Sequence, residues 1–292
     1  MERTERGVHP DALLGPDSLS AQVLGHPAVL LGGPRALLLQ VAHPAVAAGV
    51  VDHSAFDRDP YRRLARTFEV MHAIAFGSPA VSAGAAASLA AVHRRVVGTT
   101  AAGVPYAASD PGLALWVHAT LVDTALAVEE RYIGELDEAG RARFYDESRR
   151  LGPALGLDET SIPPDLGSFR AYVADMEGEL LGDHGTARAP GAEAGRIARS
   201  VLHPPPTARL GPLAPLSARA AARLVRMVTV DLGPPALCRA YGLPDRLDFV
   251  ATRSVLAMVA ALSKAASPRL PGAVRDPGTL VRLTGRLAAL AH

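Results

Sequence analysis

A helix-capping residue directly followed by proline occurs three times in the first half of the chain, at Asp59-Pro60, Ser78-Pro79 and Asp110-Pro111. The Asp or Ser side chain can accept hydrogen bonds from the free N–H groups of a first helical turn. Proline fits the first helical position because it has no N–H to satisfy. The stretches that follow are long and free of internal proline. We therefore expect long helices at about residues 60–76, 79–97 and 111–132.

Proline and glycine also delimit the other expected elements. A short apolar helix starts at Pro34 and must end near His43, because Pro44 disfavours the helical conformation in the residue before it. Glycine and proline cluster between residues 98 and 109, which indicates turns and at most a small hairpin there. Further helices are expected at about residues 137–151, 165–182, 191–202, 214–232, 245–265 and 276–289.

The composition favours one globular helical domain. Hydrophobic residues make up 49% of the chain and charged residues 20%, which is an ordinary globular balance. Aromatic residues are only 4%, so the core must be mainly aliphatic. No segment shows the sustained alternation of apolar and polar residues that is typical of strands. We expect a single all-α domain over residues 1–292, with C-terminal helices at 245–289 packed on the rest.

Charge and cysteine content exclude several classes of protein. Lys and Arg number 30 against 29 Asp and Glu, so the net charge of +1 gives no support for a nucleic-acid partner. Cys238 is the sole cysteine, which excludes a disulfide framework, a cysteine zinc site and an iron–sulfur cluster. We expect its thiol to be a buried small hydrophobic group.

The N-terminal residues, MERTERGVHP, are charged and lack the apolar stretch of a secretory signal. The apolar stretch at residues 36–51 is 16 residues long and is interrupted by His43 and Pro44, so it is too short to cross a bilayer. We expect a soluble, cytoplasmic protein without an integral membrane segment.

Several common cofactor and catalytic motifs are absent. The sequence contains no Gly-rich dinucleotide or P-loop motif and no G-x-S-x-G elbow. A helical di-iron site needs two Glu-x-x-His pairs, and only Glu69 to His72 forms one. His118 and Asp123 are five residues apart, about 140° around a helix, and cannot chelate one metal ion from a single face. These absences favour a cofactor held by one or two helical side chains.

Two histidines lie on apolar helix faces. His93 shares its face with Ala86, Leu89, Ala90 and Val97, which would leave room for a flat macrocycle near the imidazole. His118 lies on a second stripe, and the opposite side of that helix carries Trp116, Thr120 and Asp123. Spacing alone does not decide whether each histidine is a ligand of the cofactor or a core residue that is hydrogen-bonded to a backbone carbonyl. His43 ends a helix, where an imidazole can bond the last carbonyls.

The helix expected at residues 60–76 carries a mixed face. Arg63, Arg66 and Thr67 fall together at spacings of three and four, in line with Val70 and Ile74. Such a face is usually the edge of a solvated surface. Arginine is also the natural partner of a buried anion, and spacing does not decide between the two.

A series of motifs resembles a known family. In order, they are GPRALLLQVAHP at 33–44, GVVDHSAF at 49–56, RLART at 63–67, VHRRVVG at 92–98, WVHATLVD at 116–123, LGPP at 232–235 and RAYGL at 239–243. Their order and spacing are similar to those of the catalytic domain shared by latex-clearing rubber oxygenases and MpaB-type oxygenases. The resemblance covers roughly residues 20–250.

The resemblance implies a globin-like helical bundle that carries haem b. Its rubber oxygenase members cleave a carbon–carbon double bond of polyisoprene with dioxygen. The iron ligand would map onto His93, and the distal arginine and threonine onto Arg63 and Thr67. Arg66 stands where the rubber enzyme has a lysine that can cap the iron, and a guanidinium cannot do so because it stays protonated. The stretch at 41–51 also lacks a carboxylate to match the family's distal glutamate, so rubber cleavage itself is not expected.

We therefore expect a haem b-dependent oxygenase that uses dioxygen or peroxide on a small or medium apolar substrate. His93 would bind the iron, with His118 as the alternative, while Arg63, Arg66 and Thr67 would serve catalysis. His118, Asp123 and His43 are further candidates for the cofactor pocket. The alternatives are a haem-binding sensor or carrier without turnover, and a haem-free helical protein that keeps only the fold.

Overall fold

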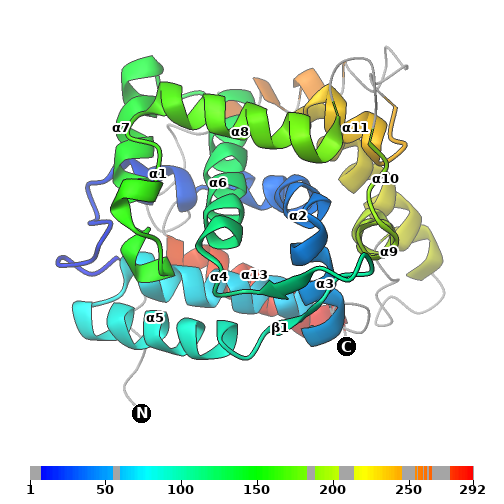
Figure 1. The fold of residues 1–292 in the computed structure, drawn as a ribbon. Coiled ribbons are helices and arrows are strands. Elements are labelled where there is room, and N and C mark those ends of the chain that lie inside the picture. Colours follow the sequence, from blue (N-terminus) through cyan, green and yellow to red (C-terminus); the bar gives the residue numbers. More distant parts are fainter. Residues whose placement is uncertain are drawn as a thin grey trace.

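The computed structural model describes residues 8–54, 60–182, 188–203, 214–244 and 277–291, together with 254, 256–258, 260–261 and 263–264. The α-helices are α1 (Leu19–Leu24), α2 (Gly33–Ala42), α3 (Pro44–His53), α4 (Pro60–Phe76), α5 (Pro79–His93), α6 (Pro111–Val128), α7 (Glu138–Arg149), α8 (Leu166–Leu181), α9 (Ala192–Leu202), α10 (Ala214–Leu232), α11 (Pro235–Ala240) and α13 (Pro277–Ala291). Short 3-10 turns lie at Pro27–Gly32, Pro153–Leu155 and Glu159–Ser161, and the strands are β1 (Val97–Thr99) and β2 (Pro105–Ala107). This architecture confirms the all-α fold class with one small hairpin (Figure 1).

Three helices begin at the prolines that the sequence indicated. The Ser78 side chain accepts from the N–H of Val81 at the start of α5, and Asp110 accepts from the N–H of Gly112 at 2.7 Å at the start of α6. α4 likewise begins at Pro60, while Asp59 lies outside the described residues. These caps satisfy backbone donors that would otherwise be free in the first turn.

Several elements differ from the expectation. α5 ends at His93, four residues early, because the chain turns there into β1. α6 passes into a π-helical turn at Glu129–Ile133, which Gly134 ends in the left-handed conformation, φ 68°. α1, α3 and α11 were not expected as helices. α3 was missed because Pro44 was treated only as a stop signal. Most of the helix expected at 245–265 lies outside the described residues.

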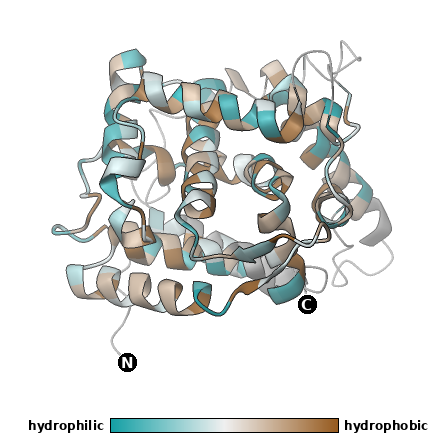
Figure 2. Ribbon diagram, in the orientation of Figure 1, coloured by the Kyte–Doolittle hydropathy of each residue, from teal (hydrophilic) through white to brown (hydrophobic). Residues whose placement is uncertain are grey.

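α6 runs through the middle of the molecule, with α8 crossing at one end and α4, α5 and α13 running past the other (Figure 1). α13 packs along α4, so the C-terminal helix lies beside one from the first quarter of the chain. Colouring by hydropathy shows the apolar character of α6 and α2 against the more polar α7 and α8 (Figure 2). The buried Trp116 of α6 donates its indole N–H to the carbonyl of Leu39 in α2 at 3.1 Å, which joins the two central helices.

The two strands of the hairpin pack closely at Gly98. β1 and β2 are antiparallel, and Gly98 lies opposite Tyr106. A Cβ atom on Gly98 would lie 2.6 Å from the Tyr106 hydroxyl oxygen, so this position requires glycine. The hydroxyl donates to Asp52 of α3 at 2.7 Å. The hairpin is thereby attached to the end of α3.

Within the described ranges, one helical segment is long and apolar enough to cross a membrane by length and composition, at Pro111–Ile133, and 56% of its most apolar window is buried inside the molecule. The 3-10 turn with α2 and α3 together pass the same test as a pair bent by 108°. The buried core helix of a globular protein meets these criteria equally well.

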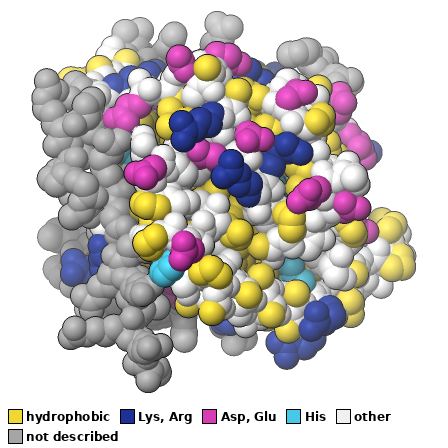
Figure 3. Space-filling model, turned by 90° about the vertical axis from the view of Figure 1, so that its left-hand side faces the viewer, with side chains coloured by type: hydrophobic (Ala, Val, Ile, Leu, Met, Phe, Trp, Pro, Cys, Tyr) yellow, Lys and Arg dark blue, Asp and Glu magenta, His cyan; other side chains and the backbone are white. Residues whose placement is uncertain are grey.

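Figure 3 shows acidic and basic side chains intermingled on one face of the molecule. On α7 such charges pair, with Arg149 and Asp146 3.5 Å apart.

Candidate functional site

The three residues expected to serve catalysis lie in the first half of α4. Arg66 and Thr67 are exposed, and the side chain of Arg63 lies outside those that the structure describes. One turn further on, Val70 is half-buried, and Ile74 is completely buried. The mixed face of α4 thus passes from an accessible polar end to a buried apolar end.

His93 is the last residue of α5 and is half-buried. Burial lowers its pKa, so the imidazole is neutral at physiological pH. On its expected face, Ala86 and Leu89 pack against α4, whereas Ala90 and Val97 are exposed. Of the four apolar residues on the face of His93, only Ala86 and Leu89 are therefore packed against the core.

α5 is a peripheral helix. Among its residues, all of which the structure describes, only Ser82 is fully buried. The Ser82 hydroxyl donates to the carbonyl of Ile74 in α4 at 2.7 Å. The helix that carries His93 is thus held mainly by one neighbour.

His118 lies in the middle of α6 and is buried. Burial lowers its pKa to about 4, so this imidazole is also neutral. Its Nε2 atom has no hydrogen-bond partner within the part of the chain that the structure describes. A buried polar atom without a partner costs about 1–3 kcal/mol, which makes Nε2 a suitable donor to a bound group.

Asp123 is paired with an arginine that the sequence analysis did not single out. Its Oδ2 atom lies 2.6 Å from Nη2 of Arg35, a buried residue of α2. Arg35 also donates to the hydroxyl of Thr124 at 2.6 Å and to the carbonyl of Leu232 at 2.9 Å. The guanidinium joins α2, α6 and the end of α10. The only available signal was one charged residue within an apolar helix.

Glu177 of α8 is a second group that the sequence analysis missed. Its pKa is raised to about 7, chiefly by burial and also by the negative charge of Asp123, while the positive charge of Arg35 opposes the shift. A carboxyl group with this pKa exchanges a proton near neutral pH, which is the property that general acids and bases need. Its position depends on packing between distant helices, so no local sequence signal marks it.

His43 caps the start of α3, whereas the sequence analysis expected it to cap the end of the helix before it. Its Nδ1 atom accepts from the N–H of Ala45 at 3.2 Å, at the start of α3, instead of bonding the last carbonyls of α2. Burial lowers its pKa, against the opposing charges of Glu179 and Asp110. The imidazole is therefore a neutral acceptor.

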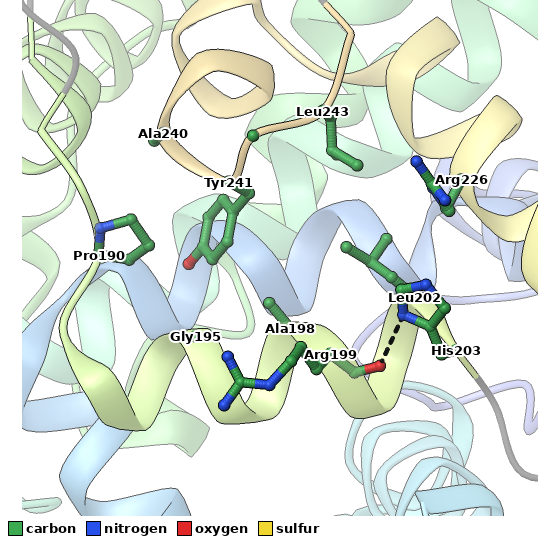
Figure 4. Close-up of a pocket in the computed structure, with 11 residues that line it drawn as sticks. Pro190, Gly195, Ala198, Arg199, Leu202, His203, Arg226, Ala240, Tyr241 and Leu243 are labelled. Carbon is green, nitrogen blue, oxygen red and sulfur yellow. Dashed lines mark hydrogen bonds between the residues drawn. The ribbon is translucent and has the colours of Figure 1, made fainter.

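The structure gathers Arg35, Asp123 and Glu177 into one charged cluster and leaves His93 and His118 on different helices. Across the described ranges, no group of three or more His, Cys, Asp or Glu side chains is arranged to hold a metal ion. Cys238 is buried, as expected. A cavity lies between α9, α10 and α11, and none of the expected site residues lines it (Figure 4).

Comparison with known proteins identifies the family. Residues 21–288 match the model of the catalytic domain of the ER-bound oxygenase mpaB/B' and rubber oxygenase. Two uncharacterized proteins, from Mycobacterium tuberculosis and Mycobacterium bovis, are each 31% identical over 140 residues, which is 47% of this chain and 55% of the relative. The aligned part thus spans about half the length of these relatives. No solved structure matches the chain. The family match covers most of the sequence, so the chain belongs to this family of oxygenase catalytic domains.

Proposed function

We propose that this member of the MpaB and rubber oxygenase family is a haem b-dependent oxygenase that acts on a small or medium-sized apolar organic substrate with dioxygen or peroxide. The family match supports oxygenase activity. The observation that best supports the cofactor is a neutral, half-buried His93 at the end of α5, the helix that packs on α4 with Arg66 and Thr67.

The donor chemistry of the chain fits haem. An imidazole must be neutral to offer a lone pair to iron, and burial favours the neutral form of both His93 and His118. The family resemblance favours His93. The unpaired Nε2 of the buried His118 supports that residue as the alternative. When bound, haem would supply the redox chemistry that activates dioxygen, and the protein would bind and orient the reactants.

The polar side chains of α4 have distinct parts in this proposal. The Arg66 guanidinium suits a propionate carboxylate, because its planar fork of N–H donors matches the two carboxylate oxygens. The Thr67 hydroxyl can donate a hydrogen bond to a polar reactant, and Arg63 would add a second cationic donor one turn earlier. Alanine-rich α5 and the aliphatic interior favour an apolar substrate.

The first test is the absorption spectrum of protein purified from cells supplied with haem precursor, with haem quantified chemically. We expect a Soret band at near-stoichiometric haem. Well-folded protein that lacks the band and refuses added hemin would refute haem dependence. Oxygen consumption with a series of alkenes then separates an oxygenase from a carrier.

Substitution identifies the ligand. His93→Gly should lose haem while circular dichroism stays unchanged, and added imidazole should restore binding by filling the vacated position. His203→Gly, at an exposed histidine at the end of α9, is the matched control and should keep its haem. Haem retained in His93→Gly but lost in His118→Gly would assign the ligand to His118.

A further inference from the structure

α5 lies at the surface of the molecule but has no charged side chain at physiological pH. Of its 15 residues only His93 can gain a charge, and burial keeps that imidazole neutral. A surface helix normally turns a charged face to water, and a helix that is apolar all round is normally buried. α5 has the sequence of a buried helix in an exposed position, because only Ser82 among its residues is fully buried. This combination indicates a face that another molecule covers.

The exposed side of α5 carries an apolar residue near each end. Val81, near the start, keeps 47% of its surface exposed, and Val92, near the end, keeps 40%. The two valines lie about three helical turns apart, so their side chains point to the same side of the helix. Gly84 and Ser88 lie between them on this side and are exposed as well. We call these four residues the outer face of α5.

Opposite charges flank the two ends of the outer face. Arg94 and Arg95 follow the last residue of α5, are exposed, and form no ion pair within the described ranges. At the other end, the N–H of His9 donates to the carbonyl of Phe76 at 2.8 Å, just before the turn into α5. Asp11 belongs to the same N-terminal segment and is exposed. Figure 1 shows this segment beside the start of α5.

We propose that the outer face of α5 binds the outer face of a second copy of this chain, with the two helices antiparallel across a two-fold axis. Val81 of each copy then meets Val92 of the other, and no charge is buried. Arg94 and Arg95 of each copy come to the start of the other α5, where Asp11 lies. Parallel helices would instead bring four arginines together, which like-charge repulsion disfavours.

The size of the contact sets its strength. A helix of this length spans about 22 Å, so the contact falls at the low end of specific interfaces. We therefore expect a weak, reversible dimer with a dissociation constant of about 10–100 µM. The contact involves neither the iron ligand nor the polar side chains of α4, so it does not depend on the haem proposal.

Sedimentation velocity of the purified protein tests the dimer. Between about 1 and 300 µM the weight-average sedimentation coefficient should rise from that of a monomer towards that of a dimer. A monomer at every concentration would overturn the proposal. Co-sedimentation of that monomer with phosphatidylglycerol vesicles would assign the outer face to a lipid surface instead.

One added charge locates the contact. Gly84 lies in the middle of the outer face, and a Cβ built there has nothing within 4 Å, so Gly84→Arg should fold normally. We expect it to raise the dissociation constant of the dimer at least tenfold. Ala174→Arg, at an exposed position of α8, is the matched control and should leave the dimer unchanged. Equal weakening by the two variants would indicate a general effect of charge and refute the site.

Exchanging the flanking charges tests the antiparallel arrangement. Arg94→Glu with Arg95→Glu makes both ends of the outer face acidic, and Asp11→Arg makes both ends basic. Each variant alone should dimerise at least tenfold more weakly than the parent. An equimolar mixture of the two should recover the dimer, because every end then meets an opposite charge. A mixture that associates no better than either variant alone would overturn the arrangement. Haem content is measured separately, so a failure of the haem proposal would leave these results unchanged.

Discussion

Glu177→Gln should change how the stability of the protein depends on pH. The Glu177 carboxyl has a pKa of about 7 in the folded chain against an ordinary 4.5, chiefly because burial disfavours its charged form. Between these pH values the unfolded chain releases the proton and the folded chain keeps it, so rising pH favours unfolding. At about 1.4 kcal/mol for each tenfold difference in proton affinity, the loss is about 3 kcal/mol between pH 4.5 and 7. Glutamine does not titrate and avoids this loss.

Urea unfolding followed by circular dichroism measures the effect. The difference in free energy of unfolding, Glu177→Gln minus parent, should increase by about 3 kcal/mol from pH 4.5 to pH 7.5. Glu179→Gln, at an exposed position two residues further along α8, is the control for the loss of one carboxylate from the same helix. A constant difference for Glu177→Gln would show that this carboxyl titrates normally in the folded protein.

Two other substitutions test contacts described above. Asp123→Ala removes the partner of the buried Arg35, and because Asp123 keeps 23% of its side chain exposed, we expect a loss of about 2–3 kcal/mol in urea unfolding, below that of a fully buried pair. An unchanged free energy of unfolding in Asp123→Ala would contradict this expectation and would mean that water or Glu177 takes over as the partner of Arg35. Gly98→Ala should cost about 1–3 kcal/mol, because its Cβ would collide with the Tyr106 ring. The control Gly84→Ala, a helical position with nothing within 4 Å, should instead stabilise the protein by about 0.5–1 kcal/mol. Equal effects of the two alanines would refute the proposed crowding at the hairpin.

Local sequence signals predicted much of the fold, because helix starts are local events. Asp110 and Ser78 cap their helices through donors two or three residues away, and such spacings are visible in a sequence. α3 was missed for a related reason: proline can mark both the end of one helix and the start of the next, and Pro44 does both, since α2 ends at Ala42 and α3 begins at Pro44.

The candidate site was less predictable, because its charged cluster is non-local. Arg35 and Asp123 are 88 residues apart, and the carbonyl of Leu232 is 197 residues from Arg35. Periodicity identifies which face of a helix is apolar but not which helix that face meets. Glu177 acquires its raised pKa only from this packing, so no pattern in the sequence of α8 reveals it.

The peripheral position of α5 has a consequence for ligand binding. A helix with one fully buried residue and one main neighbour contributes little to the global free energy of unfolding, so it should open as a local unit while α2 and α6 stay closed. Its amide protons should exchange with deuterium well before those of the central helices. A group held by His93 would bind only the closed helix, so each tenfold excess of ligand over its dissociation constant would add about 1.4 kcal/mol to the opening free energy. Deuterium uptake in α5 therefore reports cofactor occupancy independently of any absorption band.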